Sequence, residues 1–208
     1  LKVFGIEMVF IPEGAYFLGD GVSNYAFPIT NITSESSLTT ITAASSSAVT
    51  AIPTAFPKGF KAFYCMKYEI SHGQYVEFLN TLSSTQHVPR NPNGSTTYRY
   101  RVTYTGVPPT LYTTDRENRA INYLDWNDIA AYLDWAALRP MSELEYEKVC
   151  RGLEGVVPGE YAWGNTSITR ANTISTTIPS ENGTEIIVDP NANCSFNGGA
   201  YTGGDALQ

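Results

Sequence analysis

Charged side chains are scarce in this chain of 208 residues, and basic side chains are the scarcer kind. Charged residues make up 16% of the chain, whereas a typical soluble domain has about 25%. The 13 Lys and Arg against 20 Asp and Glu give a net charge of −7, and the basic residues form no cluster. Because nucleic-acid binding depends on clustered cations that displace counterions from phosphates, we expect no nucleic-acid partner.

Long apolar runs are also absent. No stretch reaches the roughly 20 apolar residues that a membrane-spanning helix requires, so we expect no membrane span. The chain begins at Leu1 without a signal peptide and ends at Gln208 without a helix stop or a polar tail. We therefore expect it to start after processing or inside a longer chain, and to be truncated at its end. The abundant Ser, Thr, Asn, Tyr and Gly residues favour a secreted or surface-displayed protein.

Cysteine is rare, and the three cysteines, Cys65, Cys150 and Cys194, lie far apart. No CxxC pair or Cys/His spacing predicts a zinc site. The sequence leaves three alternatives: buried free thiols, one disulfide with the third cysteine free or paired elsewhere, or a catalytic thiol. A disulfide would require export to an oxidising compartment.

Short apolar segments separated by glycine and proline predict strands and turns. Residues 8–12 and 14–20 predict two short strands joined by a turn, and residues 60–66 predict a buried strand. Residues 34–57 are rich in Ser, Thr and Ala, a composition that also occurs in flexible linkers. Apolar and β-branched residues interrupt this segment, so we expect an ordered, mostly extended surface excursion. Residues 86–118 lack helical periodicity and predict loops and irregular strands.

Three helices are predicted from start signals that precede apolar residues at helical spacing. Ser71 and Gln74 form a capping box ahead of the first helix, and Ser142 and Glu145 form another ahead of the third. The second helix starts at residues 125–128. The apolar faces of the first two helices comprise Tyr75, Phe78, Leu79 and Leu82, and Ile129, Tyr132, Leu133 and Ala136.

Polar residues that resemble catalytic groups have simpler structural interpretations. His72 lies in the first turn of a predicted helix, where we expect it to be exposed. Glu143, Glu145 and Glu147 lie at the start of another helix. Capping and surface ion pairs explain these glutamates better than a pair of catalytic acids does.

The positions of two tryptophans in the second predicted helix lead to a hypothesis about how that helix packs. Trp126 and Trp135 lie nine residues apart, which is about 180° around a helix. Both can be buried only if that helix lies between two layers. We expect both to anchor the helix in the core.

Five blocks of the chain carry the sequence patterns of one family. They read MVFIPEGAYFLG, YCMKYEISHGQY, AINYLDWNDIAAY, RPMSELEYE and YAWGN, at residues 8–19, 64–75, 120–132, 139–147 and 161–165. In this order and spacing they resemble the formylglycine-generating enzyme family, also called sulfatase-modifying factors, across nearly the whole chain. Pro140 and Met141 replace the usual Leu-Pro of the fourth block, and Tyr146 replaces its Trp.

The resemblance implies an α+β fold of the C-type-lectin-like kind, rich in loops and poor in regular secondary structure. It implies a single incomplete domain over residues 1–208, with the Ser/Thr-rich segment at about 34–57 as an insertion. In the family's enzymes, two cysteines near the C-terminus bind copper and use dioxygen to oxidise a sulfatase cysteine to formylglycine. No cysteine of this chain aligns with that pair, so no catalytic residue is carried over. Copper is expected only if a cysteine pair follows Gln208.

The resemblance also implies a structural calcium ion. The family holds calcium through an Asn side chain and the next carbonyl, together with an Asp side chain and a carbonyl two residues later. Asn172 and Thr173 match the first pair, and Asp205 and Leu207 match the second. Calcium prefers six to eight oxygen ligands from polar loops, which this part of the sequence supplies. The alternative is that Asn172 caps a turn and Asp205 is solvated.

Three functions remain open, because function resides in sites and not in the fold. The first is a non-catalytic extracellular or cell-surface module of a larger bacterial protein, with a binding or structural role. Its partners would be the rest of its own chain and a protein or glycan. The second is part of a copper-dependent oxidase that converts a sulfatase cysteine to formylglycine. The third is part of a related iron-dependent oxidase that acts on small thiols or amino acids.

Overall fold

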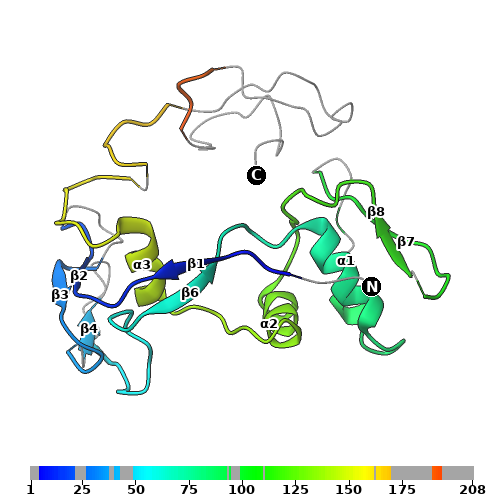
Figure 1. The fold of residues 1–208 in the computed structure, drawn as a ribbon, viewed down its shortest axis with the longest axis horizontal. Coiled ribbons are helices and arrows are strands. Elements are labelled where there is room, and N and C mark those ends of the chain that lie inside the picture. Colours follow the sequence, from blue (N-terminus) through cyan, green and yellow to red (C-terminus); the bar gives the residue numbers. More distant parts are fainter. Residues whose placement is uncertain are drawn as a thin grey trace. The chain divides into compact units, whose positions relative to one another are not determined.

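The computed structural model describes residues 5–21, 27–37, 40–42, 49–92, 94, 99–109, 111–161, 163–169 and 189–193. The chain forms two compact units, the first from Leu1–Lys67 with Met141–Ser167 and the second from Tyr68–Pro140 with Ile168–Gln208. Among the described residues, the first unit combines one short helix with three two-stranded antiparallel sheets, and the second combines short helices with one such sheet (Figure 1). This composition agrees with the expected mixture of α and β structure. Among the described residues, no helix is long and apolar enough to cross a membrane.

Two small sheets of the first unit join segments that are distant in the sequence. Strand β1 (Met8–Ile11) pairs antiparallel with β6 (Phe63–Met66), and β2 (Tyr16–Leu18) pairs antiparallel with β3 (Thr30–Ile32). Figure 1 shows β1 lying along β6. The start of the chain is therefore held by a strand that follows it by more than fifty residues.

The sequence predicted β1 and β2 correctly as strands, but the two strands belong to different sheets. Between them, the Gly14 N–H donates a hydrogen bond to the Phe60 carbonyl oxygen at 3.0 Å, which directs the chain away from a hairpin. The predicted strand at residues 60–66 is present as β6, but only one of its sides is buried. Cys65 is buried, whereas Tyr64 is 65% exposed.

The described part of the Ser/Thr-rich segment contains two extended strands, as predicted, and it also contains turns at residues 34–37 and 53–56. Within it, β4 (Thr40–Thr42) pairs antiparallel with β5 (Val49–Ala51). At its base, the Glu35 carboxylate accepts hydrogen bonds from the backbone N–H groups of Lys58, at 2.9 Å, and Lys61, at 2.8 Å. One side chain therefore clamps the two ends of the excursion together.

Helix α3 (Glu143–Arg151) begins at the predicted capping box. The Ser142 hydroxyl accepts from the Glu145 N–H at 3.1 Å, and the Glu145 carboxylate accepts from the Ser142 N–H at 2.8 Å. The helix ends at Gly152, whose φ of 74° lies in the region that glycine adopts without strain. Local sequence signals therefore specify both ends of α3.

The core of the first unit forms between α3 and the β2–β3 sheet. Leu144 packs against Tyr16, Leu18 and Ile32, all of them buried. The Tyr16 hydroxyl lies 2.8 Å from the Leu144 carbonyl oxygen and 2.9 Å from that of Lys58. This phenol therefore connects β2 to the backbone of α3 and to the end of the excursion.

A buried lysine makes the second connection between α3 and the rest of the first unit. Lys148 is 1% exposed, and its ammonium group donates hydrogen bonds to the carbonyl oxygens of Pro12 (2.7 Å), Gly59 (2.6 Å) and Phe60 (3.4 Å). The ammonium group also lies 5.8 Å from the centre of the Tyr16 ring. Three carbonyl oxygens thus satisfy the three donors of the ammonium group.

The described part of the second unit contains two helices of ten residues, a single-turn 3-10 helix and a hairpin. They are α1 (His72–Thr81), η1 (Val88–Arg90), β7 (Val102–Tyr104), β8 (Tyr112–Thr114) and α2 (Trp126–Trp135). Helices α1 and α2 both begin at capping boxes, and β8 lies against α1 (Figure 1). The buried core comprises Tyr75, Val76, Phe78, Leu79, Tyr112 and Tyr132. The predicted apolar face of α1 therefore forms much of this core.

The prediction that both tryptophans anchor α2 is wrong for Trp126. Trp126 is the first residue of the helix and is 65% exposed. Trp135 packs on the rings of Phe78 and Tyr132, with centroid separations of 5.6 and 5.8 Å. Because α2 packs on one side only, residues on its opposite sides cannot share that contact.

The prediction of an exposed His72 is also wrong, because this side chain is fully buried. Its Nδ1 lies 3.1 Å from the Arg119 carbonyl oxygen, and its Nε2 lies 3.1 Å from the Arg101 backbone nitrogen. A backbone N–H can only donate, so Nε2 accepts and Nδ1 carries the proton. The neutral imidazole satisfies both contacts, and burial lowers the pKa of His72.

Acidification should destabilise the protein through His72. Because the pKa of the folded imidazole is lowered, the unfolded chain alone takes up a proton as the pH falls below the ordinary histidine value of about 6.5. This uptake should reduce the free energy of unfolding by at most about 1.4 kcal/mol at one pH unit below that value. Urea unfolding at about pH 7.5 and about pH 5.5 measures the loss, in a range where carboxylates stay largely ionised.

The matched variant for this measurement is His72→Gln, which retains the second histidine, His87. Its free energy of unfolding should fall less between the two pH values than that of the unmodified protein. Equal acid-induced losses in the two proteins would show that His72 contributes nothing to the pH dependence.

Removal of the Lys148 ammonium group should destabilise the first unit. Lys148→Met retains an apolar stem, but the Pro12 and Gly59 carbonyl oxygens lose a buried donor, and each unsatisfied group costs about 1–3 kcal/mol. We expect the free energy of unfolding in urea to fall by about 2–5 kcal/mol. The exposed control Lys61→Met should change it by less than about 0.5 kcal/mol. A Lys148→Met variant as stable as the unmodified protein would contradict the structural role of the ammonium group.

Candidate functional site

The predicted calcium ligands Asn172, Thr173, Asp205 and Leu207 lie outside the described residues. The calcium site therefore stays a prediction. Within the part of the chain that the structure describes, no three His, Cys, Asp or Glu side chains come together in a way that could hold a metal ion.

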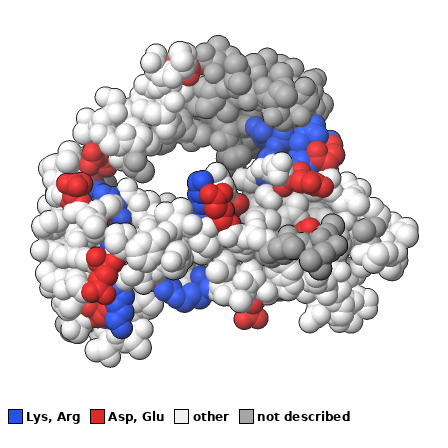
Figure 2. Space-filling view, in the orientation of Figure 1, with Lys and Arg blue, Asp and Glu red and all other residues white. Residues whose placement is uncertain are grey.

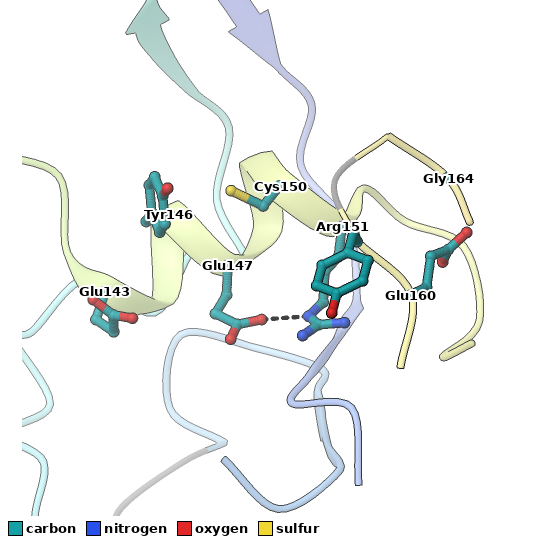
Figure 3. A pocket seen from close by; sticks show the side chains of 8 residues that line it. Glu143, Tyr146, Glu147, Cys150, Arg151, Glu160 and Gly164 are labelled. Atoms are coloured by element: carbon teal, nitrogen blue, oxygen red, sulfur yellow. Dashed lines mark hydrogen bonds and ion pairs between the residues drawn. The ribbon is translucent and has the colours of Figure 1, made fainter. Parts of the chain in front are cut away.

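A groove of about 340 Å³ runs along the outer face of α3 in the first unit (Figure 3). Eight residues line it: Glu143, Tyr146, Glu147, Cys150, Arg151, Glu160, Tyr161 and Gly164. The first five belong to α3 and follow one another at the i, i+3, i+4, i+7, i+8 spacing of a single helical face. The last three belong to the loop that follows the helix. We call this feature the α3 groove.

The opposite face of α3 explains why these residues point outward. Leu144, Glu145 and Lys148 are buried, and they hold the helix to the body of the first unit. Of the three glutamates at the start of the helix, Glu145 caps the helix as predicted, and its side chain is buried. Glu143 and Glu147 lie on the other face and line the groove.

The electrostatics of the groove are dominated by carboxylates. The Arg151 Nε donates to the Glu147 carboxylate at 2.6 Å, an ion pair between positions i and i+4 that Figure 3 marks with a dashed line. Among the described residues, neither Glu143 nor Glu160 has an ion-pair partner. Three glutamates and one arginine give the lining a charge of −2. Figure 2 shows that charged residues gather in a few patches on the face in view, with uncharged residues over most of the remaining described surface.

The loop wall of the α3 groove is held by its own contacts. The Tyr161 ring stacks on Trp163, with centroids 4.7 Å apart and planes inclined by 18°. The Trp163 Nε1–H donates to the Ser167 carbonyl oxygen at 3.0 Å. The Tyr161 N–H donates to the Asn165 carbonyl oxygen, and the Gly164 N–H donates to that of Tyr161, at 3.0 and 2.9 Å. The aromatic surface at this end of the groove is therefore positioned by a closed turn.

A phenol and a thiol lie side by side on the helical wall. The Tyr146 side chain is 55% exposed, and the neighbouring Cys150 thiol raises the pKa of Tyr146. Figure 3 shows the Cys150 sulfur directed toward the side of α3 that carries Tyr146. Both Cys150 and Cys65 are free thiols, and Cys65 is buried in β6. Cys194 lies outside the described residues, so its pairing stays open.

Sequence reasoning placed Glu143 and Glu147 at the surface but did not identify the groove. The spacing of Glu143, Tyr146, Glu147 and Cys150 contains the helical signal that could have predicted their common face. No sequence signal places Glu160 and Tyr161 beside that face, because the loop returns through tertiary contacts. The helical wall was therefore predictable, and the loop wall was not.

The α3 groove combines negative charge with aromatic and aliphatic surface. Its described lining includes one thiol and no imidazole. Both described histidines belong to the second unit, where His72 bonds backbone groups and the Nδ1 of His87 lies 2.8 Å from the Tyr112 hydroxyl. The lining can bind and orient a ligand, but it lacks the base–nucleophile pair of acyl-transfer catalysis.

Three proteins that match part of this chain carry the same name, formylglycine-generating enzyme. The formylglycine-generating enzyme of Thermomonospora curvata is 42% identical over 52 residues, which make up 25% of this chain and 16% of that protein. The enzyme of the same name from Streptomyces coelicolor is 40% identical over 52 residues, again 25% of this chain and 16% of the relative. That of Mus musculus is 40% identical over 50 residues, 24% of this chain and 13% of the relative. Each match thus covers less than a fifth of the relative's length.

The family match extends much further than these pairwise alignments. The family described as sulfatase-modifying factor enzyme 1-like domain matches residues 5–198. This range includes all five blocks that carry the resemblance. The chain therefore belongs to the family of sulfatase-modifying factor enzyme 1-like domains.

Proposed function

We propose that this domain is a non-catalytic binding module of a larger protein, and that the α3 groove is its binding surface. The observation that carries the proposal is the groove itself. It is open, it has a positioned aromatic wall, and two of its carboxylates, Glu143 and Glu160, have no ion-pair partner among the described residues. Unpaired charge beside aromatic surface is typical of a recognition site, because each group can gain a partner when a ligand arrives.

The distribution of thiols also supports a binding role. Copper selects soft thiolate ligands, and the copper-dependent chemistry of the family's enzymes uses two cysteines. The α3 groove contains one thiol, Cys150, whose neighbour is the phenol of Tyr146. The second described thiol, Cys65, is buried in a different element, β6.

A second candidate function is part of an oxidase that converts a sulfatase cysteine to formylglycine with copper, or of a related iron-dependent oxidase. The relatives named formylglycine-generating enzyme favour it, with 40–42% identity over 50–52 residues. Those stretches cover only 13–16% of the relatives. The activity of the relatives is therefore a weaker argument for this chain than the chemistry of its own groove.

The proposal extends to the fold, the location and the calcium site. Family membership supports a C-type-lectin-like fold of the formylglycine-generating type, with little regular secondary structure. The low content of charged residues supports an extracellular or cell-surface location in a bacterial protein, with a protein or glycan as partner. The sequence match of Asn172, Thr173, Asp205 and Leu207 supports a structural calcium ion.

The chain should lack formylglycine-generating activity. Incubation with copper, dioxygen and a peptide that carries a sulfatase cysteine motif should leave the peptide thiol unchanged, because the groove supplies one thiol where copper chemistry needs two. Mass spectrometry measures loss of thiol and gain of aldehyde. The positive control is an active formylglycine-generating enzyme under the same conditions. Aldehyde formation that Cys150→Ser abolishes would overturn the non-catalytic proposal and make the α3 groove a catalytic site.

Calcium should stabilise the protein. An ion that binds the folded state alone adds about 2.7 kcal/mol to the free energy of unfolding at a hundredfold excess over its Kd. A chelator should therefore lower the melting temperature, and Asp205→Ala should remove that sensitivity. The control Asp134→Ala, at an exposed position of α2, should remain sensitive to the chelator. Identical melting of the unmodified protein with and without chelator would mean that the proposed ligands bind no calcium.

A further inference from the structure

The ligand class of the α3 groove follows from its shape, its charge and its aromatic surface taken together. We propose that the groove binds an elongated organic cation, a molecule with amine or guanidinium groups at both ends of an aliphatic chain. This inference rests on the proposed binding function and deepens it. The same chemistry can come from a free diamine or polyamine, or from the Lys and Arg side chains of a peptide.

The α3 groove is elongated. Its helical wall extends from Glu143 to Arg151, nine residues whose eight steps rise about 12 Å along the helix axis. Figure 3 shows Glu143 at one end of α3, and Glu160 on the loop beyond the other end. The two carboxylates that have no ion-pair partner among the described residues therefore lie at opposite ends.

The charge of one groove carboxylate is already compensated. Glu147 and Arg151 neutralise each other through their 2.6 Å contact, between the two ends of the groove. Negative charge that lacks a partner is thus concentrated at the two ends. An anionic ligand would face both free carboxylates, while the guanidinium that could receive it is already paired. The charge pattern selects a cation with two poles.

The spacing of the groove carboxylates does not suit a metal ion. Calcium and magnesium need several oxygen ligands that converge on one point within about 2.0–2.6 Å. Among the described residues no cluster of three acidic, Cys or His side chains is close enough to form such a site. The three carboxylates of the groove are spread along its walls. Separated charges suit a cation whose own charges are separated.

Aromatic surface lies on both walls of the groove. The exposed Tyr146 ring belongs to the helical wall, and the Tyr161 ring, stacked on Trp163, belongs to the loop wall. Aromatic faces attract ammonium and guanidinium groups and also pack against methylene chains. A simple inorganic cation would gain little from this surface. An aliphatic chain between two cationic groups matches both the carboxylates and the aromatic surface.

The test compares two ligands of equal chain length by titration calorimetry. Cadaverine has an amine at each end, and pentylamine has one amine only. We expect cadaverine to bind one site per chain, about fivefold more tightly than pentylamine at low salt, because one further exposed ion pair is worth up to about this factor. Spermidine and a capped Lys-Gly-Lys peptide form two further arms. The arm that binds more tightly identifies the source of the cation, a free polyamine or a peptide.

Three charge variants localise the binding. Glu143→Gln and Glu160→Gln should each reduce cadaverine binding to the level of pentylamine. Glu154→Gln removes the same charge at an exposed position that does not line the groove, and it should leave the preference for cadaverine unchanged. Circular dichroism verifies that each variant is folded. Equal affinities for the two amines, or equal losses in all three variants, would overturn the proposal, because binding would then follow net charge alone.

A neutral saccharide and the dicarboxylate glutarate complete the panel. If either binds and Tyr161→Ala abolishes that binding, the groove is a binding surface but the cationic ligand class is wrong. If no probe binds, the α3 groove is not the binding surface, and the binding function proposed above fails with it. The two failures are thus distinguishable in one set of titrations.

Discussion

The hydrogen bonds of the Lys148 ammonium group are the contact on which the first unit depends. They join α3 to the Pro12 carbonyl, between β1 and β2, and to the Gly59 and Phe60 carbonyls, which precede β6. Burial lowers the pKa of Lys148, although the charges of Glu35 and Glu13 oppose that effect. The carbonyl oxygens favour the charged form, because an ammonium group has three donors and no acceptor. The described sheets of the first unit have only two strands each. The Lys148 hydrogen bonds therefore connect segments that a larger sheet would otherwise hold together.

The same contact determines which side of α3 faces solvent. Lys148 and Leu144 lie one turn apart on the inner face, so positions 143, 147 and 151 rotate outward. A rotation that buried any of these groove residues would pull the ammonium group away from its carbonyl partners. The structural lysine and the α3 groove are therefore two consequences of one helix orientation. A helix that is polar on its outer face and anchored by a charge on its inner face needs only a short apolar stripe.

Local signals in the sequence predicted where the helices and strands lie. The features that sequence reasoning missed depend on contacts between distant segments. The capping boxes at Ser71 and Ser142 depend on side chains three residues apart, so both helix starts were predictable. Nothing in residues 8–20 indicates that β1 pairs with β6 and not with β2. His72 was expected at the surface, but the backbone at Arg101 and Arg119 covers it. The loop wall of the groove was missed for the same reason.

The clamp at Glu35 makes the stability of the first unit largely independent of the length of the Ser/Thr-rich excursion. The carboxylate fixes the place where the chain leaves and returns, at Lys58 and Lys61. The entropy of closing a loop changes by only about 0.6 kcal/mol for each doubling of its length. Related chains can therefore diverge in the length and sequence of this insert during evolution while α3 and its surroundings stay the same. For protein engineers, the hairpin of β4 and β5 is accordingly a natural place to graft a peptide tag.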